Sequence, residues 1–373
     1  AYDEAARAVY NEALWINAAY CLEDADARVC LQSDLLRAWQ KTSVSLMPYA
    51  SDDLMRLPLA GIAGEWALVR RLAEMLPLGS VTLEIIPRSV LAPIAYAQGD
   101  TDLVWRLVHE ALPGGPETEP GGTIFLTDCV LQRLAVRMTM DADDLAAARA
   151  WLAAHDRWLA WSGATLGQAE SALLWSRYHR ASGDGETADE QARRAIALAT
   201  TPRQPLVLIA THRLLGELDT ERGRYADADG HLDEAAMIAD ACGAPYERAL
   251  TLLARAELRA ATNDRVTALT LMEEVRVICT SLGARPALLR AELLAAHLTP
   301  HQAEPAPPRP AGMTEREIEV LRLLATGSSN RVIGAALGIT TRTVERHISN
   351  IYTKIGAYSR AEAATYAIRQ GLL

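Results

Sequence analysis

The sequence predicts an all-α protein, in which an α-solenoid of helical hairpins is followed by a small domain of four helices. Three observations favour this architecture. Apolar residues recur at helical spacing through nearly the whole chain. Small residues and turn residues repeat every 40 residues in the middle of the chain. A proline-rich segment then sets off the C-terminal part. The expected divisions are residues 1–298, 299–312 and 313–373.

Alanines mark the predicted repeat. They lie 40 residues apart at Ala148, Ala188, Ala228 and Ala268. Turn residues keep the same spacing at Gly183, Gly223 and Asn263, and helix ends keep it at Gly163, Gly243 and Gly283. Each unit is therefore predicted to be a helix, a turn, a second helix and a stop. The region should hold about six to eight such hairpins, similar to tetratricopeptide repeats but with a longer period.

Two segments depart from the helical pattern. Residues 81–89, VTLEIIPRS, are β-branched enough to form a strand, and residues 113–122, PGGPETEPGG, are rich in helix breakers. We interpret both as long connections between hairpins. Five prolines between Thr299 and Gly312 predict an extended tether that lets the C-terminal domain swing.

Charge is distributed unevenly along the chain. The formal total is −10, which by itself argues against a nucleic-acid binder. From Met313 onward, however, eight basic residues face five acidic ones, a net charge of +3, which leaves −13 for the remainder. The acidic part and the basic part of the chain are therefore expected to have different functions.

Composition indicates a cytoplasmic protein without a membrane contact. No run of eighteen apolar residues occurs, and the N-terminus lacks the pattern of a secretion signal. The five cysteines are scattered and predict reduced packing residues, with a redox pair of Cys21 and Cys30 as the less favoured alternative.

The last 61 residues predict a helix-turn-helix unit. Thr314 and Glu317 form a capping box for a first helix that ends at Gly327. A second helix should start near Ser329 and end at Gly338, and Thr340 should cap the third. The predicted core residues of the second helix are Val332, Ile333, Ala336 and Leu337. Helix, three-residue turn and helix is the geometry that reads DNA.

The third helix has two distinct faces. Its apolar residues, at i, i+4, i+7 and i+11, are Val344, Ile348, Ile351 and Ile355. The opposite stripe consists of Arg342, Glu345, Arg346 and Ser349. We expect this outward stripe to meet the major groove of double-stranded DNA. The fourth helix, Ser359 to Gln370, is alanine-rich on one side.

The whole C-terminal stretch resembles the LuxR-type DNA-binding domain. The matching residues are Thr314, Glu315, Arg316, Glu317, Val320, Leu321, Gly327, Asn330, Ile333, Leu337, Thr343, Val344, His347, Asn350, Ile351, Lys354, Gly356, Ser359, Arg360 and Ala363. The resemblance implies base contacts at Glu345, Arg346 and Ser349, beside which Arg342 completes the stripe. It also implies phosphate contacts around Asn330, Thr343 and Lys354, with Arg331 as a further candidate, and a dimer contact through the fourth helix.

Plainer alternatives stand beside these roles. Glu345, where the family often carries a basic residue, could pair with Arg342 or Arg346 instead of a base. Lys354 could lie at a solvated helix end instead of on a phosphate. In the solenoid, Trp151, Trp158, Trp161 and Trp175 form a candidate ligand face, against packing between repeats as the more common use of such residues.

No catalytic constellation is found, so we predict a protein that is not an enzyme and that has no cofactor or metal in this chain. The phosphate-binding pattern GxxxxGK[ST] is absent, as are HExxH, CxxC and GxSxG. The architecture is similar to the rear half of the large ATP-dependent, MalT-like LuxR regulators, in which a nucleotide-binding module precedes a solenoid. The chain starts at Ala1 in helix-like sequence, so it is either part of such a protein or a short regulator without the ATPase.

The predicted function is sequence-specific transcription regulation, with activation as the expected effect. The solenoid would sense a small-molecule or protein inducer, and the chain would act as a homodimer or higher multimer on DNA, with RNA polymerase as a further partner. The alternative is a protein–protein scaffold whose terminal domain is a protein contact. Retention on DNA that weakens steeply with salt would separate the two.

Overall fold

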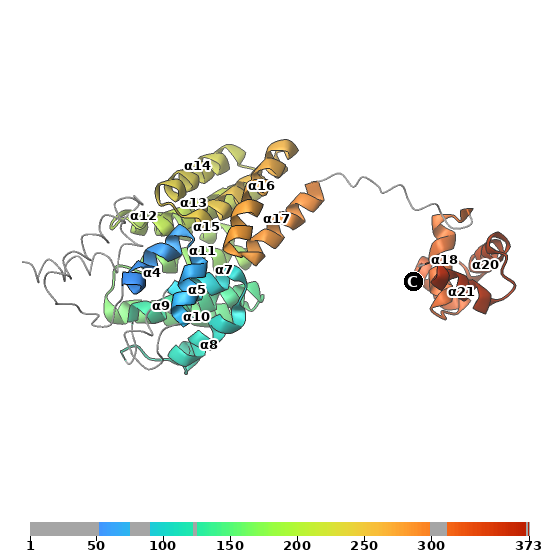
Figure 1. The fold of residues 1–373 in the computed structure, drawn as a ribbon, viewed down its shortest axis with the longest axis horizontal. Helices are drawn as coiled ribbons and strands as arrows, with labels where there is room; N and C mark the ends of the chain where they lie inside the picture. Colours follow the sequence, from blue (N-terminus) through green and yellow to red (C-terminus); the bar gives the residue numbers. More distant parts are fainter. Residues whose placement is uncertain (1–51, 75–89, 122–124, 299–311, 371, 373) are drawn as a thin grey trace, which may run out of the picture. The chain divides into compact units, whose positions relative to one another are not determined.

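The computed structural model describes residues 52–74, 90–121, 125–298, 312–370 and 372. Over these residues the regular elements are helices, as the all-α prediction requires, and the chain divides into two compact units at residues 298 and 299 (Figure 1). Within the same residues, no helix combines the length and apolar character needed to cross a bilayer. The expected connection at residues 81–89, with its strand-like composition, and most of the expected tether lie outside the described residues.

The first unit is built from consecutive helices. They are α4 (Asp52–Ala63), α5 (Trp66–Glu74), α7 (Ala92–Gln98), α8 (Thr101–Ala111), α9 (Phe125–Asp141), α10 (Leu145–Ser162), α11 (Gln168–Ala181), α12 (Gly185–Thr200), α13 (Pro205–Glu221), α14 (Tyr225–Ala241), α15 (Pro245–Ala261), α16 (Arg265–Leu282) and α17 (Arg285–Leu298). From α9 to α16 they pair into the predicted hairpins, and α17 follows the last pair.

The 40-residue repeat is confirmed at its packing and turn positions. All four marker alanines are completely buried, at 0% exposure, because each lies where the second helix of a hairpin meets the first. The turns at Gly183, Gly223 and Asn263 have φ of 84°, 73° and 62°, in the left-handed region. Asp143 adopts the same conformation at 59° and extends the series by one repeat that the sequence analysis missed. One helix end departs from the phase, where Pro205 starts α13 after a turn between Thr200 and Arg203.

Helices far apart in the sequence close the first unit on itself. Residues of α4 and α5 share one apolar core with α15, α16 and α17. The ring of Trp66 meets that of Tyr246 edge-on, with centroids 5.1 Å apart, and Gln98 donates a hydrogen bond to the carbonyl of Leu282. Figure 1 shows α4 and α5 lying across the stacked hairpins instead of extending the stack. The sequence pattern gave no sign of this closure.

The described part of the breaker-rich segment, residues 113–121, is hydrogen-bonded to the hairpin that follows. It contains a short 3-10 helix, Gly115–Glu117. The carbonyl of Thr118 accepts hydrogen bonds from Trp158 and Arg157, and the carbonyl of Pro116 accepts one from Arg157. The expected loop is therefore an ordered connection that covers one side of α10.

Three cysteines lie within the described residues, and all three are buried. They are Cys129, Cys242 and Cys279. Burial raises the pKa of Cys129 to about 12 and that of Cys279 to about 11, so both thiols stay protonated. These three are packing residues, whereas the Cys21–Cys30 alternative lies outside the described residues.

The second unit contains four helices over one small core. They are α18 (Glu315–Ala325), α19 (Asn330–Leu337), α20 (Thr341–Ile355) and α21 (Arg360–Arg369). The predicted caps are confirmed: Thr314, Ser329 and Thr340 each accept a hydrogen bond from the backbone N–H three residues on.

The predicted core of the second unit needs one correction. Val332 is 50% exposed and Ala336 is also exposed, whereas Ile333 and Gly334 are buried. The eight-residue helix α19 is short, and it turns its Ile333–Gly334 side toward α20. A stripe four residues wide was therefore too broad a prediction for this helix.

Candidate nucleic-acid interface

Helices α19 and α20 form a tight helix-turn-helix. Gly338 ends α19 in the left-handed conformation, at φ 64°, and Thr340 starts α20 after one further residue. At Gly334 a Cβ would lie 2.8 Å from the backbone oxygen of Ile339, so the helix backbone itself packs against the turn. The core side of α20 is formed by Val344 and Ile351, both fully buried. This packing fixes which side of α20 faces outward.

The predicted base-reading stripe lies on that outward side. All four of its residues, Arg342, Glu345, Arg346 and Ser349, are exposed. Within the described part of the chain, the side chains of Arg342, Glu345 and Arg346 have no hydrogen bond or ion pair. Glu345 is therefore not paired with either neighbouring arginine. The stripe presents two guanidinium groups, a carboxylate and a hydroxyl to the surroundings.

The four candidate phosphate residues differ in how free they are. Arg331 is exposed and has no partner among the described residues. The side-chain oxygen of Asn330 accepts a hydrogen bond from Arg360, and the Thr343 hydroxyl lies 2.8 Å from that of Thr340. The ammonium of Lys354 lies 2.7 Å from the carboxylate of Glu317 and also donates to the carbonyl of Gly312.

Other basic residues of this unit also brace its fold. Arg316 donates to Glu319 and to the carbonyl of Leu337, and Arg322 donates to the carbonyl of Leu372. Arg360 donates to the carbonyl of Ser328 as well as to Asn330. The cations that remain without a partner among the described residues are Arg331, Arg342, Arg346 and Arg369. Four of the eight basic residues of the domain are therefore available to an anion, and three of these four lie on α19 and α20.

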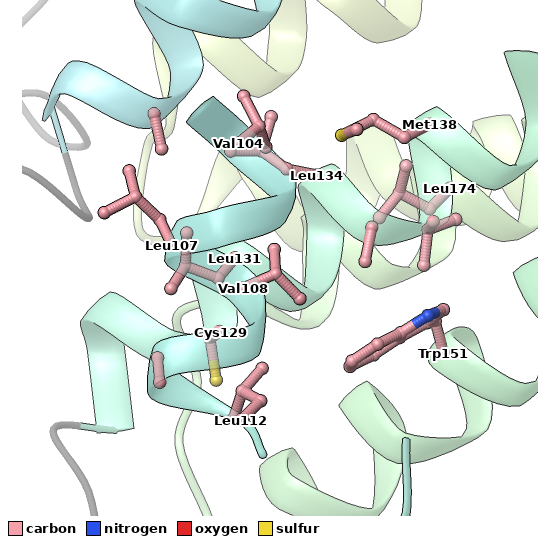
Figure 2. Packing of buried hydrophobic residues seen from close by; sticks show 14 of the residues in the cluster. Val104, Leu107, Val108, Leu112, Cys129, Leu131, Leu134, Met138, Trp151 and Leu174 are labelled. Carbon is pink, nitrogen blue, oxygen red and sulfur yellow. The ribbon is translucent and has the colours of Figure 1, made fainter. Parts of the chain in front are cut away.

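The candidate tryptophan face is not assembled as a surface. Trp151 is 4% exposed and Trp158 is 0% exposed, and both belong to the core shared by α8, α9 and α10. Figure 2 shows Trp151 close to aliphatic side chains of that core. Trp161 is 60% exposed, and the indole of Trp175 donates to Asp156. Packing within the repeats, the alternative interpretation, describes Trp151 and Trp158.

The sequence analysis missed a row of charges in the solenoid. Arg137, Arg177, Glu217 and Glu257 follow one another at the same 40-residue spacing as the marker alanines, in α9, α11, α13 and α15. The 40-residue period of the sequence could have identified these charged residues, because they recur with it just as the small residues and turn residues do.

These features define the second unit as a helix-turn-helix domain with a free polar face. Residues 311–367 match the family model described as bacterial regulatory proteins, luxR family. The C-terminal unit is therefore a LuxR-type DNA-binding domain.

Similar proteins match through this unit. The transcriptional regulatory protein LiaR of Bacillus subtilis (strain 168) is 44% identical over 73 residues, which are 20% of this chain and 34% of LiaR. The response regulator protein VraR of Staphylococcus aureus (strain NCTC 8325 / PS 47) is 44% identical over 61 residues, 16% of this chain and 29% of VraR. The chain thus spans about a third of the length of these relatives.

Solved structures resemble the helical architecture. A Rap protein complexed with competence and sporulation factor aligns over 99% of this chain and 97% of that chain, with a TM-score of 0.54 and 10% identity. At this identity the likeness shows the fold alone. A signal transduction ATPase with numerous domains from Pyrococcus horikoshii, with a tetratricopeptide repeat sensor, aligns over 94% of this chain and 54% of that chain at a TM-score of 0.43 and 13% identity.

Proposed function

We propose that this chain is a sequence-specific, DNA-binding transcription regulator that inserts α20 into the major groove. The observation that carries the proposal is the exposed stripe on α20, whose two arginines and one glutamate have no partner among the described residues. Arginine can donate two hydrogen bonds to guanine, and glutamate can accept one from the amino group of cytosine. The printed names of LiaR and VraR, a transcriptional regulatory protein and a response regulator protein, support the same class.

Phosphate binding would position this stripe on the duplex. Arg331 and Thr343 lie at the starts of α19 and α20, where backbone N–H groups and the helix dipole also favour an anion. The side chains of Asn330 and Lys354 already interact with Arg360 and Glu317, so we assign these two residues to phosphate only as secondary contacts. Such contacts set register and affinity, whereas the stripe on α20 sets sequence preference.

We propose that the chain binds DNA as a homodimer or higher multimer, because a single C-terminal domain has little positive charge with which to bind it. A net charge of +3 is small for phosphate neutralisation, and the rest of the chain carries −13. Ile368 on α21 is 64% exposed and provides an apolar contact for a second domain. The solenoid would sense an inducer and control this assembly, with activation of transcription and a contact to RNA polymerase as the expected results.

The test is retention of the full chain on DNA as salt is raised. A preferred site is first selected from a random pool, and retention is then measured at about 50 to 200 mM salt, over which it should fall steeply. Arg346→Ala should weaken binding to the preferred site by about 1 to 3 kcal/mol and leave binding to random DNA nearly unchanged. Arg369→Ala, which removes another exposed arginine of the same domain, should affect both DNAs alike.

Two outcomes would contradict the proposal. Retention that is absent, or that does not change with salt, would favour a protein–protein scaffold. Equal losses on preferred and random DNA for Arg346→Ala would remove the base-reading role of α20 while leaving DNA binding intact.

A further inference from the structure

The first helices of successive hairpins form one continuous layer inside the solenoid. Each of α9, α11, α13, α15 and α17 contacts the next in that order. Arg290 of α17 reaches Glu257 of α15, at 2.7 Å, and also lies 3.9 Å from Glu217 of α13, although α15 stands between. Side chains from three helices therefore converge on one side of this layer.

The charged row at the 40-residue spacing lies in this layer, and its acidic half is neutralised within the protein. Glu217 pairs with Arg180 and Arg290, and Glu257 receives two hydrogen bonds from Arg290. Burial alone would raise the pKa of Glu217, but these arginines hold it below its ordinary value. Glu217 is therefore matched by arginines. At Glu257 burial raises the pKa above its ordinary value, although Arg290 opposes this shift.

The basic half of the row forms no ion pair among the described residues. Among the described residues, Arg177 has no hydrogen bond or ion pair. The guanidinium carbon of Arg137 lies 4.3 Å from the centre of the Tyr96 ring, and its Nε is buried without a hydrogen-bond partner. The nearby carboxylate of Asp141 is already engaged, because it accepts a hydrogen bond of 2.6 Å from the Tyr96 hydroxyl. No carboxylate forms an ion pair with either arginine in the described part of the chain. Burial alone would lower the pKa of Arg137, but Tyr96, Tyr246, Glu247 and Asp141 nearby raise it above its ordinary value.

A third guanidinium joins these two. Arg213 of α13 donates to Glu247 at 2.8 Å and to Thr251 at 3.4 Å. Burial, with Arg137 and Arg213 adding to its effect, lowers the pKa of Arg177 to about 10, although Glu217 and Tyr96 oppose the shift. Arg177 therefore lies within electrostatic range of both other arginines. We call Arg137, Arg177 and Arg213 the arginine cluster. One carboxylate, Glu247, is paired within it.

Gathering like charges inside a protein destabilises the fold unless an opposite charge joins them. Both Arg137 and Arg177 keep part of their surface accessible to solvent, so an ion can reach them. Tyr246 adds a neutral donor beside Arg137: burial raises its pKa to about 12, and its hydroxyl has no partner among the described residues. The layer thus provides cations, a hydroxyl and the face of Tyr96 in one place.

We propose that the arginine cluster and the Tyr246 hydroxyl form the ligand site of the solenoid, which takes a small organic anion bearing a carboxylate or a phosphate. The planar fork of each guanidinium fits either group through paired hydrogen bonds. Such an anion would supply the negative charge that Glu217 and Glu257 supply in the other half of the row. This inference rests on the sensor role proposed above and specifies the chemical class of the inducer.

The experiment is calorimetric titration of the full chain with inorganic phosphate and, separately, with malonate, against chloride at matched ionic strength. At least one of the two should bind, and which one binds distinguishes a phosphate from a carboxylate ligand. Arg177→Gln should weaken that binding by about tenfold or more. Arg248→Gln removes one half-buried arginine of α15 outside the cluster, which pairs with Asp240 and Glu274, and should change that binding by less than about twofold.

Thermal unfolding provides a second measurement. Without added anion, Arg177→Gln should unfold at a higher temperature than the unchanged chain, because it relieves repulsion within the cluster. The proposal is overturned if neither probe binds more tightly than chloride, if Arg177→Gln binds them as the unchanged chain does, or if that variant is less stable without anion.

These readouts contain no DNA. Anion binding without DNA retention would remove the proposed regulator function and leave the anion site standing. DNA retention without anion binding would overturn the anion site and leave the proposed regulator function standing.

Discussion

Individual side chains of the C-terminal domain show how one residue type serves two purposes. Three arginines donate hydrogen bonds to backbone carbonyls of the domain: Arg316, Arg322 and Arg360. Two others, Arg342 and Arg346, are exposed and have no partner among the described residues. The sequence identified the outward pair by helical spacing. It could not identify the bracing residues, because their carbonyl partners lie 21 to 50 positions away in the chain.

Lys354 is the residue whose assignment the structure changes most. Its partner Glu317 is only 4% exposed, so a variant without the ammonium leaves a buried carboxylate with fewer donors. We expect Lys354→Met to reduce the free energy of unfolding of the C-terminal unit by about 1 to 3 kcal/mol at pH 7. Arg331→Met should cost less than about 0.5 kcal/mol, because Arg331 has no such partner. Amide hydrogen exchange of α18 and α20 in the full chain measures both.

The same pair gives a dependence on pH. Burial alone would raise the pKa of Glu317, but hydrogen bonds with Lys354 and Thr314 lower it below its ordinary value of 4.5. A lowered carboxyl pKa stabilises the fold above the unfolded pKa, and this stabilisation is lost as pH falls through the folded pKa. The difference between Lys354→Met and the unchanged chain should therefore shrink as pH falls below about 4.5. A constant difference down to strongly acidic pH would show that the pair contributes nothing.

Among the helices, the short α19 depends on close backbone contact. Gly334→Ala would gain helix propensity, but its Cβ would meet the backbone oxygen of Ile339 at 2.8 Å. We expect a loss of stability of about 1 to 3 kcal/mol and weaker DNA binding, because α20 would be pushed from its place. Gly230→Ala is the matched control.

Gly230 also lies inside a helix, α14, but a Cβ there meets nothing within 4 Å. Gly230→Ala should therefore stabilise the solenoid by about 0.5 to 1 kcal/mol. Chemical denaturation followed by circular dichroism measures both glycine variants. Two stabilising substitutions would mean that α19 does not pack against the turn as described.

The two compact units of the whole chain should unfold separately. All eight tryptophans lie in the first unit, so indole fluorescence follows the solenoid alone, whereas circular dichroism follows both units. Gly334→Ala should shift part of the dichroism transition and leave the fluorescence transition in place. A fluorescence transition that moves with Gly334→Ala would show that the units are coupled energetically.

The sequence by itself determined the features that depend on neighbours along the chain. These are the helical class, the 40-residue period with its buried alanines, the caps Thr314, Ser329 and Thr340, and the outward side of α20. Each follows from interactions three or four residues apart, or from a turn that admits few residue types. Spacing alone therefore located the candidate DNA-reading stripe.

Only the tertiary structure decided which distant residues meet. It placed α4 and α5 against α15 to α17 and paired Lys354 with Glu317. It also buried Trp151 and Trp158, matched Glu217 with Arg180 and Arg290, and left Arg177 without an ion pair among the described residues. These outcomes depend on how the helices pack against one another over many residues. A periodic sequence fixes which side of a helix is buried, but the partner of a charge is set by the packing of helices that are far apart in the chain.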